Sequence, residues 1–201
     1  MPEMAMVYVL VGLMAVLWLV FGVSAWSKVH SGAARRSFAG SLRPLGLLPD
    51  RLVAPVATAV TAGEILLTVG CTWAMLATVA LPGERVVVVA VLAAAGLLLS
   101  VLTLGVGLAL GRGANGRCAC FGATERPLSR RHLVRNSLLL LIVAGGLAGV
   151  ATAPPRPAQP AGVVLGLAAG LAAALVLIHL DDLAALFGPV RSAGPGSQTR
   201  N

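Results

Sequence analysis

The chain has 201 residues, of which 58% are hydrophobic and only 11% are charged, and its mean hydropathy is +0.92. Soluble domains carry roughly a quarter charged residues, so this composition excludes a soluble globular enzyme and predicts an integral membrane protein with lipid as its main solvent. The formal net charge of +8 does not indicate a nucleic-acid binder, because aromatic residues make up only 4% and the basic residues fall in short blocks between apolar segments.

Five apolar segments are each long enough to cross a bilayer as a helix, which needs about 20 residues. They are residues 4–25, 54–81, 86–110, 133–152 and 161–180. No basic residue precedes the first segment, so we expect a retained span rather than a cleavable signal peptide. The sequence therefore predicts an all-α integral membrane protein. It contains no internal repeat of the kind that is typical of secondary transporters.

The connections between the predicted spans are of two kinds. Residues 26–53 and 111–132 are long and basic, and we expect both to be loops. We expect residues 82–84 to form a tight turn, and residues 154–157 to form a linker, because this segment is too rich in proline to be helical. The tail at 188–201 is rich in Gly, Ser and Pro, which predicts disorder.

The basic residues are distributed unevenly between the two sides of such a bundle. With five spans, thirteen of the fifteen Lys and Arg residues fall on the side of the two long connections and the tail, and only Arg85 and Arg156 fall opposite. The positive-inside rule then predicts an N-terminus outside and a C-terminus in the cytoplasm. We expect a multi-pass protein of the cell inner (plasma) membrane.

The second long connection contains a motif that could carry chemistry. Cys118 and Cys120 are separated by one residue, so they lie on the same side of an extended backbone and a disulfide between them would be strained. Strained, accessible disulfides exchange readily, and a positive charge such as that of Arg117 stabilises the thiolate. On spacing alone, redox exchange, a soft metal site such as Cu(I) and a structural role all stay open. No spacing typical of a three-ligand metal site occurs.

Glu64 lies about eleven residues into the second predicted span, where a charge is costly and commonly marks a functional site. Its expected partner is Lys28 or an arginine at the rim of the bundle, and the alternative is a protonated glutamate hydrogen-bonded between helices. Thr61, Thr68 and Cys71 recur with Glu64 at helical spacing, so we expect one stripe facing the bundle. The threonines are interpreted as structural and Cys71 as a buried small residue.

Two further features bear on the interior of the bundle. His132 opens the fourth span about a dozen residues after Cys120, where an imidazole could assist thiol deprotonation or could simply be an interfacial residue. Several glycines allow close contact between helices, but they do not decide whether that contact lies within one chain or between chains. These are Gly105, Gly107, Gly145, Gly146, Gly149, Gly162, Gly166 and Gly170.

The run from Cys118 to Gly122 resembles the Cys-x-Cys-Phe-Gly signature of the methylamine utilisation protein MauE family, which belongs to a wider DoxX-like group of small membrane proteins. Other features that fit the family occur in the expected order. They are a Gly-x-Ser-x-x-Ser-Lys pattern from Gly22 to Lys28, then Leu48 and Pro49, then Glu64, then Arg135 and Asn136. The resemblance covers residues 5–152.

The resemblance implies a four-helix membrane domain at 1–152. The linker with the fifth span at 153–187 and the tail at 188–201 lie outside the shared domain. The resemblance also implies a redox-associated protein that aids disulfide formation or maturation of partner proteins, and the family description suggests a link to methylamine metabolism. Cys118 and Cys120 would be the catalytic pair. The supporting residues would be Glu64, Lys28, Arg117 and His132.

The resemblance and the motif together suggest which molecules the protein works with. A thioredoxin-like or disulfide-containing protein is the expected soluble partner, and similarity in plan to the quinone-linked vitamin K epoxide reductase bundle implies a quinone as electron acceptor. A noncatalytic membrane assembly or chaperone subunit is the alternative. The charge count puts the cysteine pair in the cytoplasm, whereas oxidation of secreted partners requires the outer side. Inward electron transfer, a re-entrant loop or a misleading charge bias would each explain the difference.

Overall fold

The computed structural model describes all residues except 1, 82–84, 113–129, 153–158 and 181–201. Over the described ranges it is all-α, which confirms the predicted fold class. Its elements are α1 (Pro2–Val29), α2 (Gly32–Leu42), the 3-10 turn η1 (Arg43–Leu45), α3 (Asp50–Ala80), α4 (Arg85–Gly111), α5 (Arg130–Thr152) and α6 (Pro160–Ile178). The predicted disordered tail lies outside the described residues.

Within the described residues, five helices are long and apolar enough to cross a membrane, which confirms the five predicted spans. They are α1, α3, α4, α5 and α6. The longest, α3, has 31 residues, which corresponds to about 46 Å at 1.5 Å per residue. That length exceeds the roughly 30 Å hydrocarbon core of a bilayer, so the ends of α3 reach the headgroup region.

The prediction that residues 26–53 form a loop is wrong, because most of this connection is helical. The hydroxyl of Ser31 caps α2 by accepting a hydrogen bond from the backbone N–H of Ala34 at 3.1 Å. Phe38 and Leu45 bury their side chains against the bundle, and Gly46, at φ 61°, turns the chain towards α3. A short polar helix such as α2 does not meet the criterion of about 20 consecutive apolar residues, so that criterion does not predict it.

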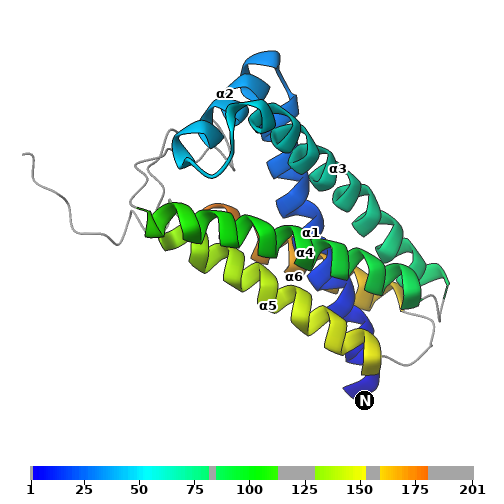
Figure 1. The fold of residues 1–201 in the computed structure, drawn as a ribbon. Coiled ribbons are helices and arrows are strands. Elements are labelled where there is room, and N and C mark those ends of the chain that lie inside the picture. The colour runs from blue at the N-terminus through cyan, green and yellow to red at the C-terminus, as the bar shows by residue number, and fades with distance from the viewer. Residues whose placement is uncertain (1, 82–84, 113–129, 153–158, 181–201) are drawn as a thin grey trace, which may run out of the picture.

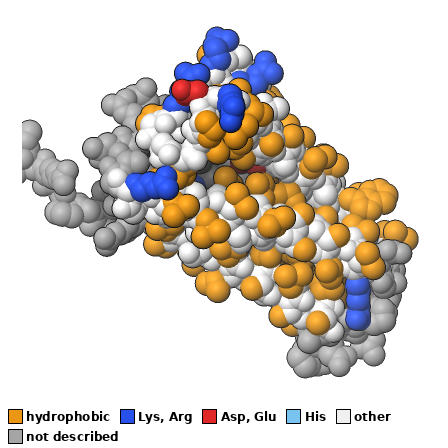
Figure 2. Space-filling view, viewed as in Figure 1, with side chains coloured by type: hydrophobic (Ala, Val, Ile, Leu, Met, Phe, Trp, Pro, Cys, Tyr) orange, Lys and Arg blue, Asp and Glu red, His pale blue; other side chains and the backbone are white. Residues whose placement is uncertain are grey.

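The central helix of the bundle is α1. It packs against α3, α5 and α6, while α4 packs against α3 and α5 (Figure 1). Met14, Leu17 and Val20 of α1 are almost completely buried in the resulting core. Large apolar side chains on the outer helices are exposed instead, and Figure 2 shows them spread over the flank of the molecule. Such a surface suits contact with lipid.

The contact between α1 and α6 is made through glycines. Gly162, Gly166 and Gly170 are four residues apart and therefore share one face of α6. A Cβ atom on Gly166 would lie 2.5 Å from the backbone oxygen of Tyr8, and one on Gly170 would overlap the carbonyl of Gly12. Gly162 and Gly166 both meet Tyr8, and Gly170, one turn further along α6, meets Gly12, one turn further along α1, so the two helices run parallel. The sequence did not decide whether these glycines contact a helix of the same chain or of another chain. In the structure, Gly162, Gly166 and Gly170 contact α1 of the same chain.

The helices α3 and α4 are close along part of their length and diverge towards one end (Figure 1). Where they are close, a Cβ atom on Gly63 would lie 3.6 Å from the side chain of Leu98. Further along α4, Gly105 faces the side chain of Leu47, which follows η1. Leu47, in the segment between η1 and α3, thus contacts α4 at the end where α3 has moved away.

Candidate functional site

A buried ion pair joins the end of α1 to the middle of α3. The ammonium nitrogen of Lys28 lies 2.7 Å from both carboxylate oxygens of Glu64. Ser24, one helical turn before Lys28, accepts a hydrogen bond from the same ammonium at 2.7 Å and donates one to Glu64 Oε1 at 2.8 Å. We call these three residues the ion-pair cluster. It matches the three N–H groups of Lys28 with three acceptors.

Burial makes this arrangement energetically important. The side chains of Lys28 and Glu64 are only 2% and 4% exposed, and Ser24 is 1% exposed. A single charge inside a membrane helix bundle is costly, but two opposite charges with satisfied hydrogen bonds are tolerated. Loss of either partner would leave the other charge buried and uncompensated. The cluster therefore makes the packing of α1 on α3 depend on two specific side chains.

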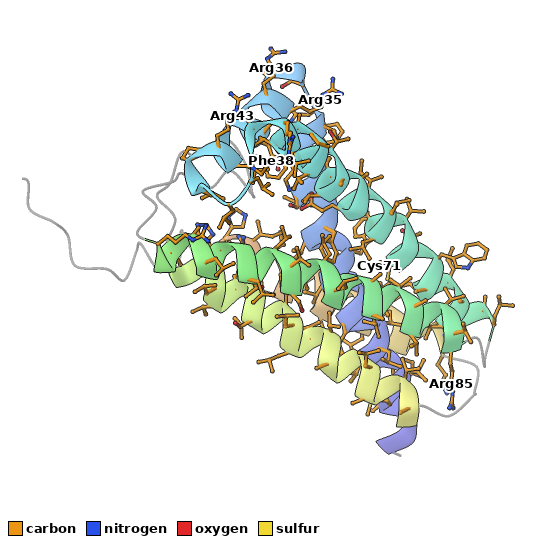
Figure 3. The ribbon with its side chains drawn as sticks, in the orientation of Figure 1. Arg35, Arg36, Phe38, Arg43, Cys71 and Arg85 are labelled. Carbon is orange, nitrogen blue, oxygen red and sulfur yellow. The ribbon has the colours of Figure 1, made fainter. Side chains whose placement is uncertain are left out.

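An aromatic ring from a third element covers the cluster. Phe38 of α2 is buried, and the Lys28 ammonium lies 4.8 Å from the centre of its ring. This distance is within the range of a cation–π interaction. Figure 3 shows Phe38 on the side of α2 that faces the bundle. The cluster thus fixes α2 as well as α1 and α3.

The Gly-x-Ser-x-x-Ser-Lys pattern now has a physical explanation. A Cβ atom on Gly22 would touch the methyl group of Thr68 at 3.5 Å, so the glycine brings α1 close to α3. Ser24 and Lys28 follow at a spacing that puts them on one face. The hydroxyl of Ser27 bonds to the backbone oxygen of Ser24 at 2.7 Å. The pattern therefore combines a close approach of α1 to α3 at Gly22 with polar contacts from Ser24 and Lys28 to Glu64.

The predicted stripe on α3 faces the bundle. Glu64 and Cys71 are buried, and Thr61 and Thr68 are half-buried. The threonine hydroxyls do not bridge helices, however: Thr61 donates to the backbone oxygen of Ala57 at 2.9 Å, and Thr68 donates to that of Glu64 at 2.8 Å. Bonds within the same helix satisfy these hydroxyls, so they are structural but do not join α3 to its neighbours.

The helix ends that flank the cysteine motif lie next to each other. A Cβ atom on Gly107, near the end of α4, would lie 4.0 Å from Leu133 in the first turn of α5. Arg112, just after α4, donates a hydrogen bond to the backbone oxygen of Gly46 at 3.4 Å. Both ends of the connection are thus at the end of the bundle that carries α2.

The remaining predicted site residues have different outcomes. Cys118, Cys120 and Arg117 lie outside the described residues. His132 is half-buried in the first turn of α5, on an element separate from those that form the ion-pair cluster. Arg135 and Asn136 of the same helix are buried, at 5% and 7% exposure. Of the predicted supporting residues, the structure brings Lys28 and Glu64 together.

Sequence reasoning missed two residues of this site. Ser24 had a signal, since it stands one turn before Lys28 in a membrane segment, where a hydroxyl needs a partner. Phe38 had none beyond being an aromatic residue in a polar connection. Its contact with Lys28 depends on how α2 folds back on the bundle.

The fold and the cluster define a polytopic helical membrane protein whose interior contains a complete buried ion pair. A model of the family described as methylamine utilisation protein MauE matches residues 6–149, and the chain belongs to this family. The matched residues run from α1 nearly to the end of α5 and include the whole ion-pair cluster, whereas α6 lies beyond them. No curated protein and no solved structure matches the chain.

Proposed function

We propose that this protein is a membrane thiol-disulfide component that aids disulfide formation or maturation of partner proteins. The observation that carries the proposal is the Cys118-Ala119-Cys120-Phe121-Gly122 run between α4 and α5 of a MauE family member. Two thiols one residue apart form a strained disulfide, and such disulfides are readily attacked by an incoming thiolate. The two cysteines are the proposed working pair.

The proposed reaction is thiol-disulfide exchange. A thiolate of the partner attacks one sulfur of the Cys118–Cys120 disulfide, which gives a mixed disulfide and releases the other thiolate. The second thiolate of the partner then resolves the mixed disulfide. The partner loses two electrons and two protons as its disulfide forms, and the Cys118–Cys120 pair gains them as a dithiol.

The other predicted residues have supporting roles in this proposal. Arg117 and His132 flank the pair in sequence. The positive charge of Arg117 favours the thiolate form, and the proposed role of the His132 imidazole is to assist thiol deprotonation. Lys28 and Glu64 act at a distance as positioning residues, because they fix α1, α2 and α3 at the end of the bundle where the connection between α4 and α5 is attached. A thioredoxin-like protein is the proposed soluble partner.

A membrane quinone is the proposed class of electron acceptor, since the dithiol must lose two electrons and two protons before the next cycle. The ion-pair cluster does not fit a quinone carbonyl, because the three N–H groups of Lys28 already have acceptors at 2.7 Å from Ser24 and Glu64. We therefore assign no quinone contact to these residues. The proposal also includes residence in the plasma membrane, with the N-terminus outside and the C-terminus in the cytoplasm.

Trapping of the partner tests the proposal. Cys118→Ser and Cys120→Ser should each stop disulfide transfer, and one of them should accumulate a mixed disulfide that mass spectrometry identifies after non-reducing electrophoresis. Cys71→Ser is the matched control, since this thiol is buried in α3. The identity of the trapped protein also tests the link to methylamine metabolism that the family description suggests.

Thiol labelling with and without a reductant measures whether Cys118 and Cys120 are oxidised in cells, and it can therefore contradict the proposal. If Cys118 and Cys120 are always reduced in cells, and the double serine variant still supports maturation of the partner, exchange at this pair is excluded. The protein would then act as a noncatalytic assembly or chaperone subunit.

A further inference from the structure

One end of the bundle presents a group of exposed arginines that the proposed redox reaction does not use. Figure 2 shows basic side chains gathered over α2, and Figure 3 labels three of them there, with Arg85 at the opposite end. The group consists of Arg35 and Arg36 of α2, Arg43 of η1, Arg51 in the first turn of α3, and Arg112 after α4. We call these five residues the α2 basic surface.

Among the described residues, little negative charge lies near this surface. Asp50 is the acidic residue beside it, and its carboxylate lies 3.8 Å from Nε of Arg43, with both side chains largely exposed. An exposed pair at that distance neutralises little of the local field. Glu64 contributes nothing to the balance because it is buried against Lys28. Five arginines against one aspartate leave four positive charges without a counter-charge among the described side chains at this end.

The arginines are held on a fixed support. Phe38 and Leu45 anchor α2 and η1 to the bundle, and Ser31 caps the start of α2. Arg112 joins the end of α4 to the turn at Gly46 through its hydrogen bond at 3.4 Å. The backbone that carries these arginines is therefore anchored to the bundle, while their exposed side chains stay accessible to a ligand.

The position of this surface indicates what binds there. Arg51 lies in the first turn of α3 and Arg112 directly follows the last residue of α4, so both mark the boundary between an apolar span and water. At about 46 Å, α3 is long enough to carry this boundary into the headgroup layer. Phospholipid headgroups already surround the protein at that depth, at a concentration that a soluble acidic protein does not reach.

We infer that the α2 basic surface binds the headgroups of anionic phospholipids in the leaflet at this end of the bundle. Clustered arginines beside a membrane helix attract anionic lipids with an energy that grows with each charge near the surface. This inference is independent of the proposed redox function.

Competition between lipids tests the inference. The full-length protein is reconstituted in nanodiscs of phosphatidylcholine, or of phosphatidylcholine mixed with phosphatidylglycerol, and lipid retention is measured by native mass spectrometry. The wild type should retain phosphatidylglycerol in preference. Arg36→Gln should weaken that retention about fivefold, and the triple variant with Arg35→Gln and Arg43→Gln should weaken it further. Arg85→Gln, a matched change at the opposite end, should leave retention unchanged.

Each contrary result overturns the inference. Equal retention of the two lipids by the wild type would show that the surface serves another partner, such as an acidic protein. Equal effects of Arg36→Gln and Arg85→Gln would show general attraction without a surface. Displacement of phosphatidylglycerol by soluble glycerol phosphate at the same concentration would indicate a free phosphate site. If the triple variant does not fold, high salt applied to the wild type should still abolish the preference, and a preference that survives salt would count against the inference.

Discussion

The ammonium group of Lys28, in the last turn of α1, lies 2.7 Å from both carboxylate oxygens of Glu64, which is near the middle of α3. Both side chains are buried, and Ser24 bonds to each of them. Two helices that are 36 residues apart in sequence at this contact are thus joined by a complete ion pair. Removal of one partner of this ion pair should therefore destabilise the protein more than removal of both partners.

We expect Glu64→Gln and Lys28→Met each to lower the free energy of unfolding by about 3 kcal/mol, because each leaves one buried charge uncompensated. Glu64→Leu should cost more than Glu64→Gln, since the leucine also removes the acceptors of Lys28 and Ser24. The double variant with Lys28→Met and Glu64→Leu should recover most of the loss, since no buried charge remains. Thermal unfolding in detergent measures the stability of each variant relative to the wild type. If the double variant were less stable than both single variants, the two charges would not be coupled.

The glycine face of α6 gives a second prediction. Gly166→Ala and Gly170→Ala should each destabilise the protein by about 1–3 kcal/mol, because a Cβ atom at either position would collide with the backbone of α1. Gly63→Ala is the matched control, since its Cβ would meet Leu98 at an ordinary 3.6 Å. The unfolding midpoint checks this difference. Equal midpoints for all three variants would mean that α6 does not depend on close contact with α1.

Topology can be tested at two exposed arginines that Figure 3 shows at opposite ends of the bundle. In a background with Cys118→Ser and Cys120→Ser, we expect Arg85→Cys to react with a membrane-impermeant maleimide in intact cells. Arg36→Cys should react only after permeabilisation, because the basic end is predicted to face the cytoplasm. The reverse labelling pattern would invert the bundle, and it would put the connection between α4 and α5 outside.

The third cysteine, Cys71, should not react with thiol reagents in the folded protein. Cys71 is 0% exposed in the core of the bundle, between α3 and its neighbours. We expect no reaction with maleimide in the folded protein and full reaction after denaturation in detergent. Cys71→Ala should cost about 1 kcal/mol, the scale for loss of a small buried group. Labelling of Cys71 in the native state would show that α3 separates from its neighbours, and the labelling tests above would need the Cys71→Ala background.

The candidate site could be predicted in part. Glu64 is conspicuous in an apolar segment, and the spacing of Thr61, Glu64, Thr68 and Cys71 correctly predicts the face of α3 that packs inwards. The sequence did not choose between Lys28 and an arginine as the partner of Glu64. Nor did it indicate Phe38, because no local pattern says how a short connection folds back on the bundle.

Membrane spans and family membership were determined by the sequence alone, because each depends on a local property. A span needs only enough consecutive apolar residues to satisfy its own backbone inside lipid, and the Cys-x-Cys-Phe-Gly run is contiguous. The tertiary structure alone decided that Lys28 pairs with Glu64, that α2 covers this pair, and that the glycines of α6 meet α1 of the same chain. These contacts depend on the rotation and register of whole helices, which are set by packing summed over the bundle rather than by any one segment.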